Sequence, residues 1–287
     1  YVVPAFLFAA IPAIFAAYAY AILSSAMPRA GGSYLYASRG LSPYLGFIAS
    51  FSQWFGLSIV IGVISYIIVP FIRDVFFNLG FINISDFLEV GSVRLTISLL
   101  LIWFFVLINI VGGKVYKNTL IPMLVIMFVL GSIVLITGLV YDQNDFINSV
   151  LNSENRVIEP TSDIKFDWKI FLTAATLMFS SFIGFDAIAQ TGNEAKNPTK
   201  NIPRAILLAI FIVASYYILF TISVYNIVPW SFVADESITK DITAPGLLSY
   251  VLPPFWGILI IIGAAIALIN DLPAMILSVS RLMFAWA

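Results

Sequence analysis

The stretch that decides the fold is residues 168–190, which read WKIFLTAATLMFSSFIGFDAIAQ. It is long enough to cross a bilayer, since a spanning helix needs about 20 mainly apolar residues. The apolar run is interrupted by Ser180, Ser181, Gly184 and Asp186. A charged side chain at membrane depth costs about 2.5–3.5 kcal/mol even on lenient insertion scales, so it is seldom present without a role. The stretch therefore predicts a spanning helix that breaks partway and leaves backbone groups available to a solute.

The composition indicates a protein whose main solvent is lipid. Of the 287 residues, 61% are hydrophobic and 10% are charged, and the mean hydropathy is +1.02; a soluble domain carries about 25% charged residues. The net charge of −1 argues against nucleic-acid binding, which needs a basic face. The chain has no cysteine and no histidine, which removes thiol nucleophiles, the commonest metal ligand and the usual general base. We therefore expect neither an enzyme nor a bound cofactor.

Seven stretches are long and apolar enough to form spanning helices. Proline marks several starts, at Pro43, Pro203 and Pro254, where a helix accepts it. The longest polar stretch, residues 142–167, is too short to bury a core of its own. We therefore expect one all-α transmembrane domain over residues 1–287, multi-pass in the cell membrane. The expected spans are residues 3–26, 43–72, 95–111, 119–141, 168–190, 203–228 and 254–284.

The loops predict how the chain is oriented. Alternate connections are short and basic, and the connections between them are longer and richer in acids. Because basic loops face the cytoplasm, we expect the short set inside. An odd number of spans then starts this chain outside. The first residues carry no charged leader and no cleavage site, so we expect a chain cut within a larger protein. The basic positions in the short loops are 29, 39, 114, 117, 196, 200 and 204.

Asp186 and its neighbours are the first candidates for a binding site. Asp186 can act in gating by contacting a solute amine, a proton or a neighbouring helix, or it can cap the second half-helix or pair with a basic loop residue. Gly184 can let the backbone unwind or approach a ligand, or it can allow close helix packing. Ser180 and Ser181 can offer hydroxyls to a carboxylate or a sodium ion, or bond back to their own helix.

The last apolar stretch contains a second group of polar residues. Asn270 and Asp271 lie inside it and Pro273 follows, so we expect an interruption like that at residues 180–186. Asp271 is a candidate for substrate selectivity or ion coupling, because an unpaired carboxylate at that depth is costly. The alternative is a polar contact that steadies neighbouring helices. Gln53, on the second stretch, is interpreted as an interhelical contact rather than a ligand.

Three motifs resemble amino acid permeases of the amino acid–polyamine–organocation (APC) superfamily. PRAGGSY at residues 28–34 is similar to the loop after the second helix of these permeases. FIGFD at 182–186, EAKNP at 194–198 and NIPRAI at 201–206 resemble their sixth helix and the loop after it. Residues 270–281 resemble the end of their eighth helix. The match runs nearly end to end and in order.

The resemblance implies a LeuT-like bundle of two inverted five-helix repeats, in which helices one and six are broken around the solute. The seven stretches then correspond to helices two to eight of about twelve. The first helix, which grips the substrate carboxylate in the family, lies outside this sequence. By position, the expected substrate-binding residues are Ser180, Ser181, Phe182, Ile183 and Gly184, with Ile61, Ile64 and either Asp271 or Leu272 facing them. The expected gate residues are Phe185 and Asp186.

The implied function is secondary active transport of amino acids or related amines by alternating access. The expected partners are that substrate and the lipid bilayer, and no nucleic acid. A channel or a non-transporting solute sensor of the same fold is the alternative, although the chain has no repeated filter motif. A coupling ion, Na⁺ or H⁺, stays open. Residues 119–141 lack the lysine that some proton-coupled relatives place in the fifth family helix.

Overall fold

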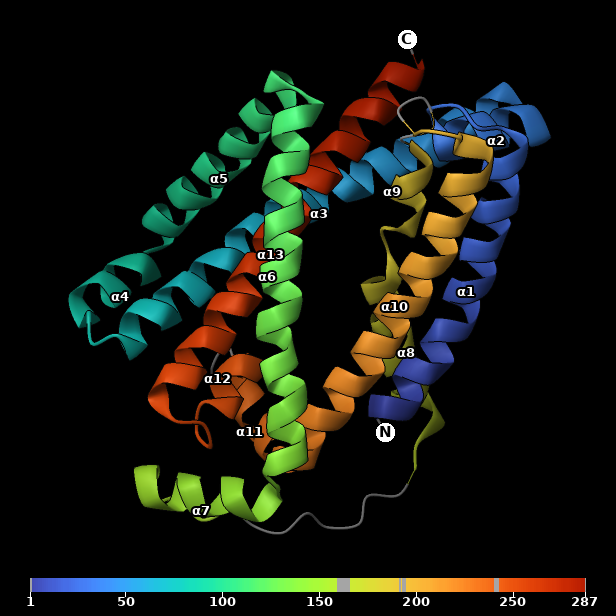
Figure 1. Cartoon of the computed structure of the whole chain (residues 1–287). Coiled ribbons are helices and arrows are strands. Elements are labelled where there is room, and N and C mark those ends of the chain that lie inside the picture. Colours follow the sequence, from blue (N-terminus) through green and yellow to red (C-terminus); the bar gives the residue numbers. More distant parts are fainter. Residues whose placement is uncertain (1, 159–165, 191, 193–194, 240–242, 287) are drawn as a thin grey trace. The chain divides into compact units, whose positions relative to one another are not determined.

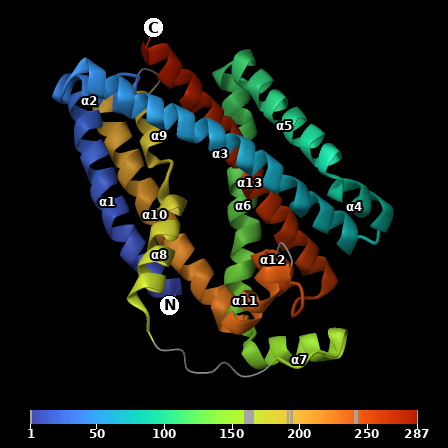
Figure 2. The same ribbon diagram turned by 180° about the vertical axis from the view of Figure 1, so that it is seen from behind.

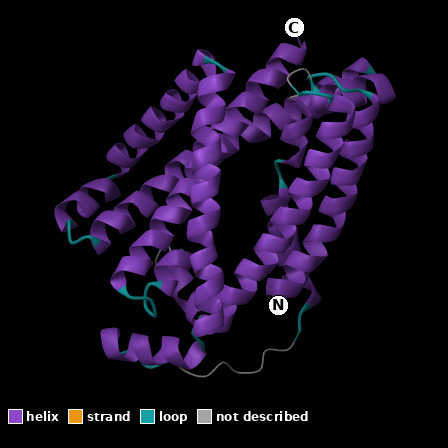
Figure 3. Ribbon diagram, in the orientation of Figure 1, coloured by secondary structure: helices purple, strands orange, loops and turns teal. Residues whose placement is uncertain are grey.

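The computed structural model describes residues 2–158, 166–190, 192, 195–239 and 243–286, and these residues form helices and no strands (Figures 1 and 3). This confirms the prediction of an all-α protein. The helices are α1 (Val2–Ala26), α2 (Gly32–Gly40), α3 (Pro43–Asn78), α4 (Ile82–Glu89), α5 (Gly91–Val111), α6 (Gly113–Val140), α7 (Gln143–Glu154), α8 (Trp168–Phe179), α9 (Phe185–Gln190), α10 (Pro198–Ile227), α11 (Trp230–Thr239), α12 (Ala244–Leu248) and α13 (Pro254–Trp286), with a 3-10 turn, η1 (Ser180–Phe182), between α8 and α9.

Among the described residues, seven helical segments have the length and hydropathy needed to cross a membrane. This confirms a polytopic membrane protein and the expected number of spans. The second span continues to Asn78 instead of ending near Ile72. Short helices, which the hydropathy pattern did not predict, fill several of the connections; they are α2, α4, α7, α11 and α12.

The chain packs into two compact units. Unit 1 comprises Tyr1–Val63, Phe166–Ile218 and Leu272–Ala287, and unit 2 comprises Ile64–Lys165 and Leu219–Asp271. Helices α3, α10 and α13 each contribute residues to both units. The interrupted segment α8–η1–α9 belongs entirely to unit 1.

In unit 1, α1 packs against both α8 and α9, and Figures 1 and 2 show α1 and α8 side by side. The buried face of α1 is a row of alanines four residues apart, Ala5, Ala9, Ala13 and Ala17. Residues four apart share one helix face, and small side chains let membrane helices approach closely. Three of these alanines lie in one buried cluster with Phe182 of η1. The sequence of α1 thus fixes the position of the interrupted segment.

In unit 2, aromatic and charged side chains hold α7 and α11 together with the segment after α12. The rings of Phe146 and Phe232 are 5.1 Å apart, and the Tyr250 ring lies 5.7 Å from that of Phe146. Arg156 forms an ion pair with Glu236 and lies over the Phe232 ring, 5.2 Å from its centre. These contacts order residues of two connections between spans, which are far apart in the sequence.

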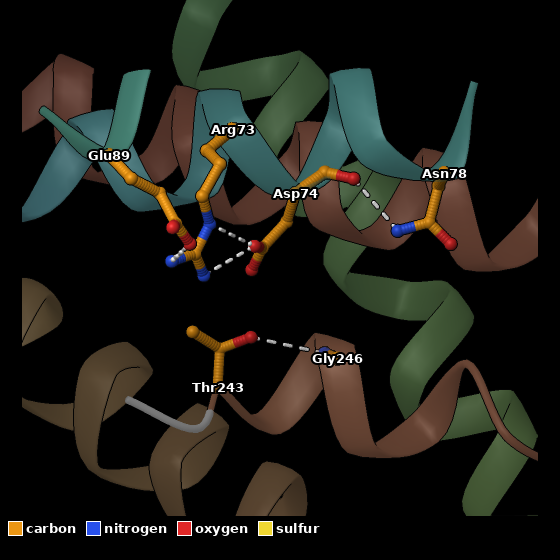
Figure 4. A network of polar contacts seen from close by, with 6 residues as sticks. All are labelled: Arg73, Asp74, Asn78, Glu89, Thr243 and Gly246. Atoms are coloured by element: carbon orange, nitrogen blue, oxygen red, sulfur yellow. Dashed lines mark hydrogen bonds and ion pairs between the residues drawn. The ribbon is translucent and has the colours of Figure 1, made fainter. Parts of the chain in front are cut away.

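A second polar cluster in unit 2 joins α3 to α4 (Figure 4). The guanidinium of Arg73 lies 2.6 Å from the Asp74 carboxylate and 3.1 Å from that of Glu89. In the same view Thr243 caps α12 by accepting a hydrogen bond from the Gly246 N–H at 3.1 Å. Each contact joins residues close to the end of a helix, so we interpret the cluster as structural.

The predicted interruption at Asn270 and Asp271 is wrong, because α13 is continuous from Pro254 to Trp286. Pro273 has no N–H, so the Ile269 carbonyl loses its helical donor there. Membrane helices tolerate such a loss. In the same way α1, α3, α6 and α10 each contain an interior proline without ending there. Two polar side chains and a proline therefore did not suffice to break the helix.

Candidate functional site

The break in the fifth span lies where it was predicted, between α8 and α9 (Figure 3). Helix α8 tightens into η1, and the Ile183 N–H bonds to the Ser180 carbonyl at 3.2 Å. Ile183 is extended, with ψ of 139°, and Gly184 has φ of +126°. Glycine adopts positive φ without the penalty that a β-carbon brings. The next helical bond, from the Ala187 N–H to the Gly184 carbonyl at 3.0 Å, starts α9.

The space beside Gly184 is open. Apart from Gly184 itself and its two chain neighbours, no atom of the described residues lies within 4 Å of the point where a β-carbon would be built on it. The alternative interpretation of this glycine, close helix packing, predicts atoms at that point, as there are at Gly263 of α13, where the Leu130 Cβ would be 2.6 Å away. The geometry therefore favours the unwinding role of Gly184.

Asp186 closes the break from the α9 side. Its Oδ1 accepts a hydrogen bond from the Gly184 N–H at 3.1 Å, and its Oδ2 accepts one from the Nε2 of Gln53 on α3. Two of the roles left open by the sequence are therefore combined in one side chain: Asp186 caps the second half-helix and contacts a neighbouring helix. Both carboxylate oxygens carry a donor from the protein.

The two serines differ in what they offer. The Ser180 hydroxyl donates to the Leu177 carbonyl at 2.6 Å, within its own helix. Ser181 makes no side-chain hydrogen bond to any residue that the structure describes. Ile183 is 54% exposed. Of the residues expected to line the pocket, Ser181 and Ile183 thus have side chains that can meet a solute, whereas the N–H and the carbonyl of Gly184 are both bonded within the protein.

The two phenylalanines of the motif pack inside unit 1. Phe182 is 3% exposed and makes edge contacts with Phe6 of α1 and Tyr217 of α10, at ring distances of 6.5 and 5.8 Å. Phe185 is half-buried, and its ring lies 5.7 Å from that of Tyr20. Phe182 therefore anchors η1, whereas the less buried Phe185 remains a candidate gate.

The remaining predicted site residues lie on other helices. Ile61, on α3 in unit 1, is buried at 7% exposure. Ile64 and Asp271 belong to unit 2, where Ile64 is half-buried and Asp271 is exposed. Glu194, in the EAKNP motif, lies outside the described residues. The part of the chain that the structure describes contains no group of three or more acidic, histidine or cysteine residues suited to a metal ion.

Sequence reasoning undervalued Gln53, which proves to be the hub of a polar cluster. Besides donating to Asp186, Gln53 accepts hydrogen bonds at its Oε1 from the Ser33 hydroxyl at 2.7 Å and from the Gln190 Nε2 at 3.3 Å. Tyr20 of α1 bonds to Ser33 at 2.7 Å. The sequence does carry a signal, because Gln53 and Gln190 place amide side chains inside two apolar spans. Such an amide is as costly to leave unpaired as the neighbouring serines are.

Comparison with known proteins assigns the family. The amino acid permease family matches residues 1–287, the entire chain. The chain belongs to this family. This confirms the resemblance read from the three motifs, because the matching family is one of amino acid permeases. The seven apolar spans and the broken fifth span are consistent with the LeuT-like architecture.

Individual relatives share modest identity with this permease. A branched-chain amino acid permease of Bacillus subtilis is 23% identical over 98% of the chain and 58% of its own length. A cationic amino acid transporter of Arabidopsis thaliana, described as chloroplastic, is 32% identical over 37% of the chain and 18% of its own. An uncharacterized transporter of Mycobacterium tuberculosis is 33% identical over 40% of the chain and 26% of its own. The chain thus spans 58% or less of these relatives.

Proposed function

We propose that the protein is a secondary active transporter of amino acids or related amines in the cell membrane, and that the solute binds at the break between α8 and α9. The observation that carries this proposal is the positive φ of Gly184 together with the open space beside it. In a membrane a freed backbone group must find a partner, and a small polar solute is a suitable one. Membership of the permease family supplies the chemical class of that solute.

The proposed contacts follow from which groups are not already paired. The Ser181 hydroxyl makes no side-chain hydrogen bond to the described residues, so it is offered to the carboxylate end of the solute, and the Gly184 N–H joins it when its bond to Asp186 opens. Asp186 is already bonded on both oxygens, so we assign it to the gate and not to the resting binding site. Phe185, packed on Tyr20, is proposed to move with it. Alternating access then moves α9 relative to its neighbours.

The substrate class is proposed from the names of two relatives. A branched-chain permease covers nearly the whole chain, and a cationic transporter matches a shorter part at higher identity. The exposed apolar Ile183 suits a branched-chain substrate. We place the neutral, apolar amino acids first, because Ile183, the large exposed side chain of the break, is apolar.

The test is a competition screen with the full-length protein in reconstituted vesicles. Uptake of labelled leucine is measured with unlabelled amino acids as competitors, under a sodium gradient, a proton gradient, or neither. We expect saturable, stereoselective uptake, inhibited most strongly by branched-chain amino acids. Dependence on one gradient identifies the coupling ion, and uptake without either indicates exchange or facilitated passage. Single-channel currents, or binding without flux, would replace transport by the channel or sensor alternative.

A further inference from the structure

Helix α9 has few means of holding its position, because it contains only six residues, from Phe185 to Gln190. Helices so short are marginal without tertiary contacts. It packs against α1 and α2 in unit 1. The chain on its N-terminal side is the break itself, so α9 is not continued by a rigid helix there. What keeps it in place must come from side chains, and the polar cluster around Gln53 provides them.

The hydrogen bonds of the cluster have a fixed direction. A serine hydroxyl has one hydrogen, and that of Ser33 is donated to Gln53, so in the Tyr20–Ser33 pair the tyrosine must be the donor. Gln53 in turn donates its Nε2–H to Asp186. Asp186 receives a second donor from the Gly184 N–H. A chain of hydrogen bonds therefore leads from Tyr20 on α1 through Ser33 on α2 and Gln53 on α3 to the carboxylate that caps α9.

The other end of α9 docks on α2 through an amide. Gln190 is fully buried, and its Nε2 donates to the Oε1 of Gln53 at 3.3 Å. Its side chain fills the place of the missing β-carbon of Gly32, which would be 2.7 Å from that Nε2. Gly32 has φ of +34°. Gly32, in the PRAGGSY motif, therefore makes room for the side chain that ends α9.

We propose that Gln53 is a positioning residue: it holds α9 at both ends, through Asp186 and Gln190, against α1 and α2, and forms a latch that must open when α9 moves. The proposal rests on the proposed function for its biological meaning, since the moving part is the gate of the transporter. The latch itself is a property of unit 1. Gln53 touches no solute-facing group of the break, so it acts through Asp186 and not on the substrate.

A donor–acceptor exchange tests the latch. In Asp186→Asn alone, one oxygen is replaced by an NH₂ group that faces a donor, either Gln53 or the Gly184 N–H. In Gln53→Glu alone, two carboxylates face each other. The double variant Q53E/D186N restores a complete set: the carboxylate introduced at position 53 accepts from Ser33, from Gln190 and from the new amide, while the oxygen of that amide accepts from Gly184.

The readout is the reactivity of one thiol on α9 in the full-length protein. The 287-residue chain contains no cysteine, so Ala187→Cys introduces a single reporter into it. We expect Gln53→Leu, Gln53→Glu and Asp186→Asn each to raise its rate of labelling by N-ethylmaleimide about three- to fifteen-fold, the range that corresponds to about 0.6–1.7 kcal/mol for a hydrogen bond between membrane helices. The double variant should return to within about twofold of the native rate.

Two controls separate a latch from general loosening. Ser58→Ala removes a hydroxyl on the same helix, α3, that bonds only to the Trp54 carbonyl, and it should leave the labelling rate unchanged. A second reporter, Ala214→Cys, lies in the buried core of unit 1 on α10. Its labelling should stay slow in every variant. If both reporters speed up together, Gln53 only stabilises the fold and the latch is refuted.

Transport is measured on the same variants to keep the two proposals apart. If the native protein takes up no amino acid, the proposed function fails, yet the labelling pattern still tests the latch. If uptake is native-like in Gln53→Leu, or if Q53E/D186N labels as fast as the single variants, the latch is wrong whatever the protein transports. Rescue of labelling without rescue of uptake would keep the latch and assign the Asp186 charge a separate part in transport.

Discussion

At Gly184 the backbone conformation matters more than the space around it. A β-carbon would meet no described atom there, but φ of +126° is a conformation that other residues rarely adopt, at a cost of about 1–3 kcal/mol. We expect Gly184→Ala to lower the thermal stability of the purified full-length protein and to reduce uptake. Gly56→Ala is the matched control, since Gly56 lies inside α3 with open space beside it. Equal behaviour of the two variants would contradict a required break.

Asp271 gives a second prediction for a single residue. It is exposed on a continuous helix, so its carboxylate is a suitable partner for a charged solute only if that solute is cationic. We expect Asp271→Asn to weaken competition by arginine and lysine about tenfold, the scale of one charged hydrogen bond, and to leave competition by leucine unchanged. The measurement is the inhibition constant of each amino acid in vesicles. An equal loss for neutral and cationic competitors would remove Asp271 from substrate selection.

Among the elements, the segment that follows α7 is joined to α11 by an ion pair with unequal partners. Glu236 is 6% exposed, whereas the Arg156 side chain is 40% exposed, and the hydrogen bond to Glu236 raises the pKa of Arg156. Replacing the arginine removes the cationic partner of a buried carboxylate, while replacing the glutamate removes the buried charge itself. We therefore expect Arg156→Met to lower the melting temperature more than Glu236→Gln does. Melting curves that are equal, or that show the reverse order, would contradict this interpretation.

A glycine in unit 2 tests how α6 and α10 pack. A β-carbon on Gly138 would overlap Ser223, including its backbone, and the neighbouring Asn226 bonds to the Gly138 carbonyl at 3.0 Å. Because overpacking of this kind costs about 1–3 kcal/mol, we expect Gly138→Ala to lower the melting temperature. Gly91→Ala, at an open position of the same unit, should not. If both changes are neutral, these helices are not in close contact.

The elements also mark where sequence reasoning succeeded and where it stopped. Hydropathy located all seven spans, because it measures the free energy of transfer to lipid, which decides insertion. It could not separate the break at Gly184 from the false one at Asn270, because both are polar interruptions of an apolar run. The difference is in the backbone: a left-handed glycine ends hydrogen bonding, whereas Pro273 removes one donor and α13 continues.

The polar cluster was beyond sequence reasoning for a related reason. Gln53 and Gln190 lie 137 positions apart, and no periodicity connects them. Their roles depend on which helices meet in unit 1. The contact of α1 with the interrupted segment is made by alanines of α1, and a row of alanines is common to many spans. Asp186 was recognised because a charge is conspicuous in lipid. Of the two amides, the sequence singles out only Gln53, as an interhelical contact, and it predicts no role for Gln190.

For the whole molecule, the central claim is that the main chain at the break binds the amino acid. The most direct measurement is a structure of the full-length protein determined with a transported amino acid bound. We expect its carboxylate within hydrogen-bonding distance of the Ser181 hydroxyl or of the Gly184 N–H, released from Asp186, with Gly184 still at positive φ. A ligand bound elsewhere, or a continuous helix through Gly184 in the ligand-bound protein, would contradict the account.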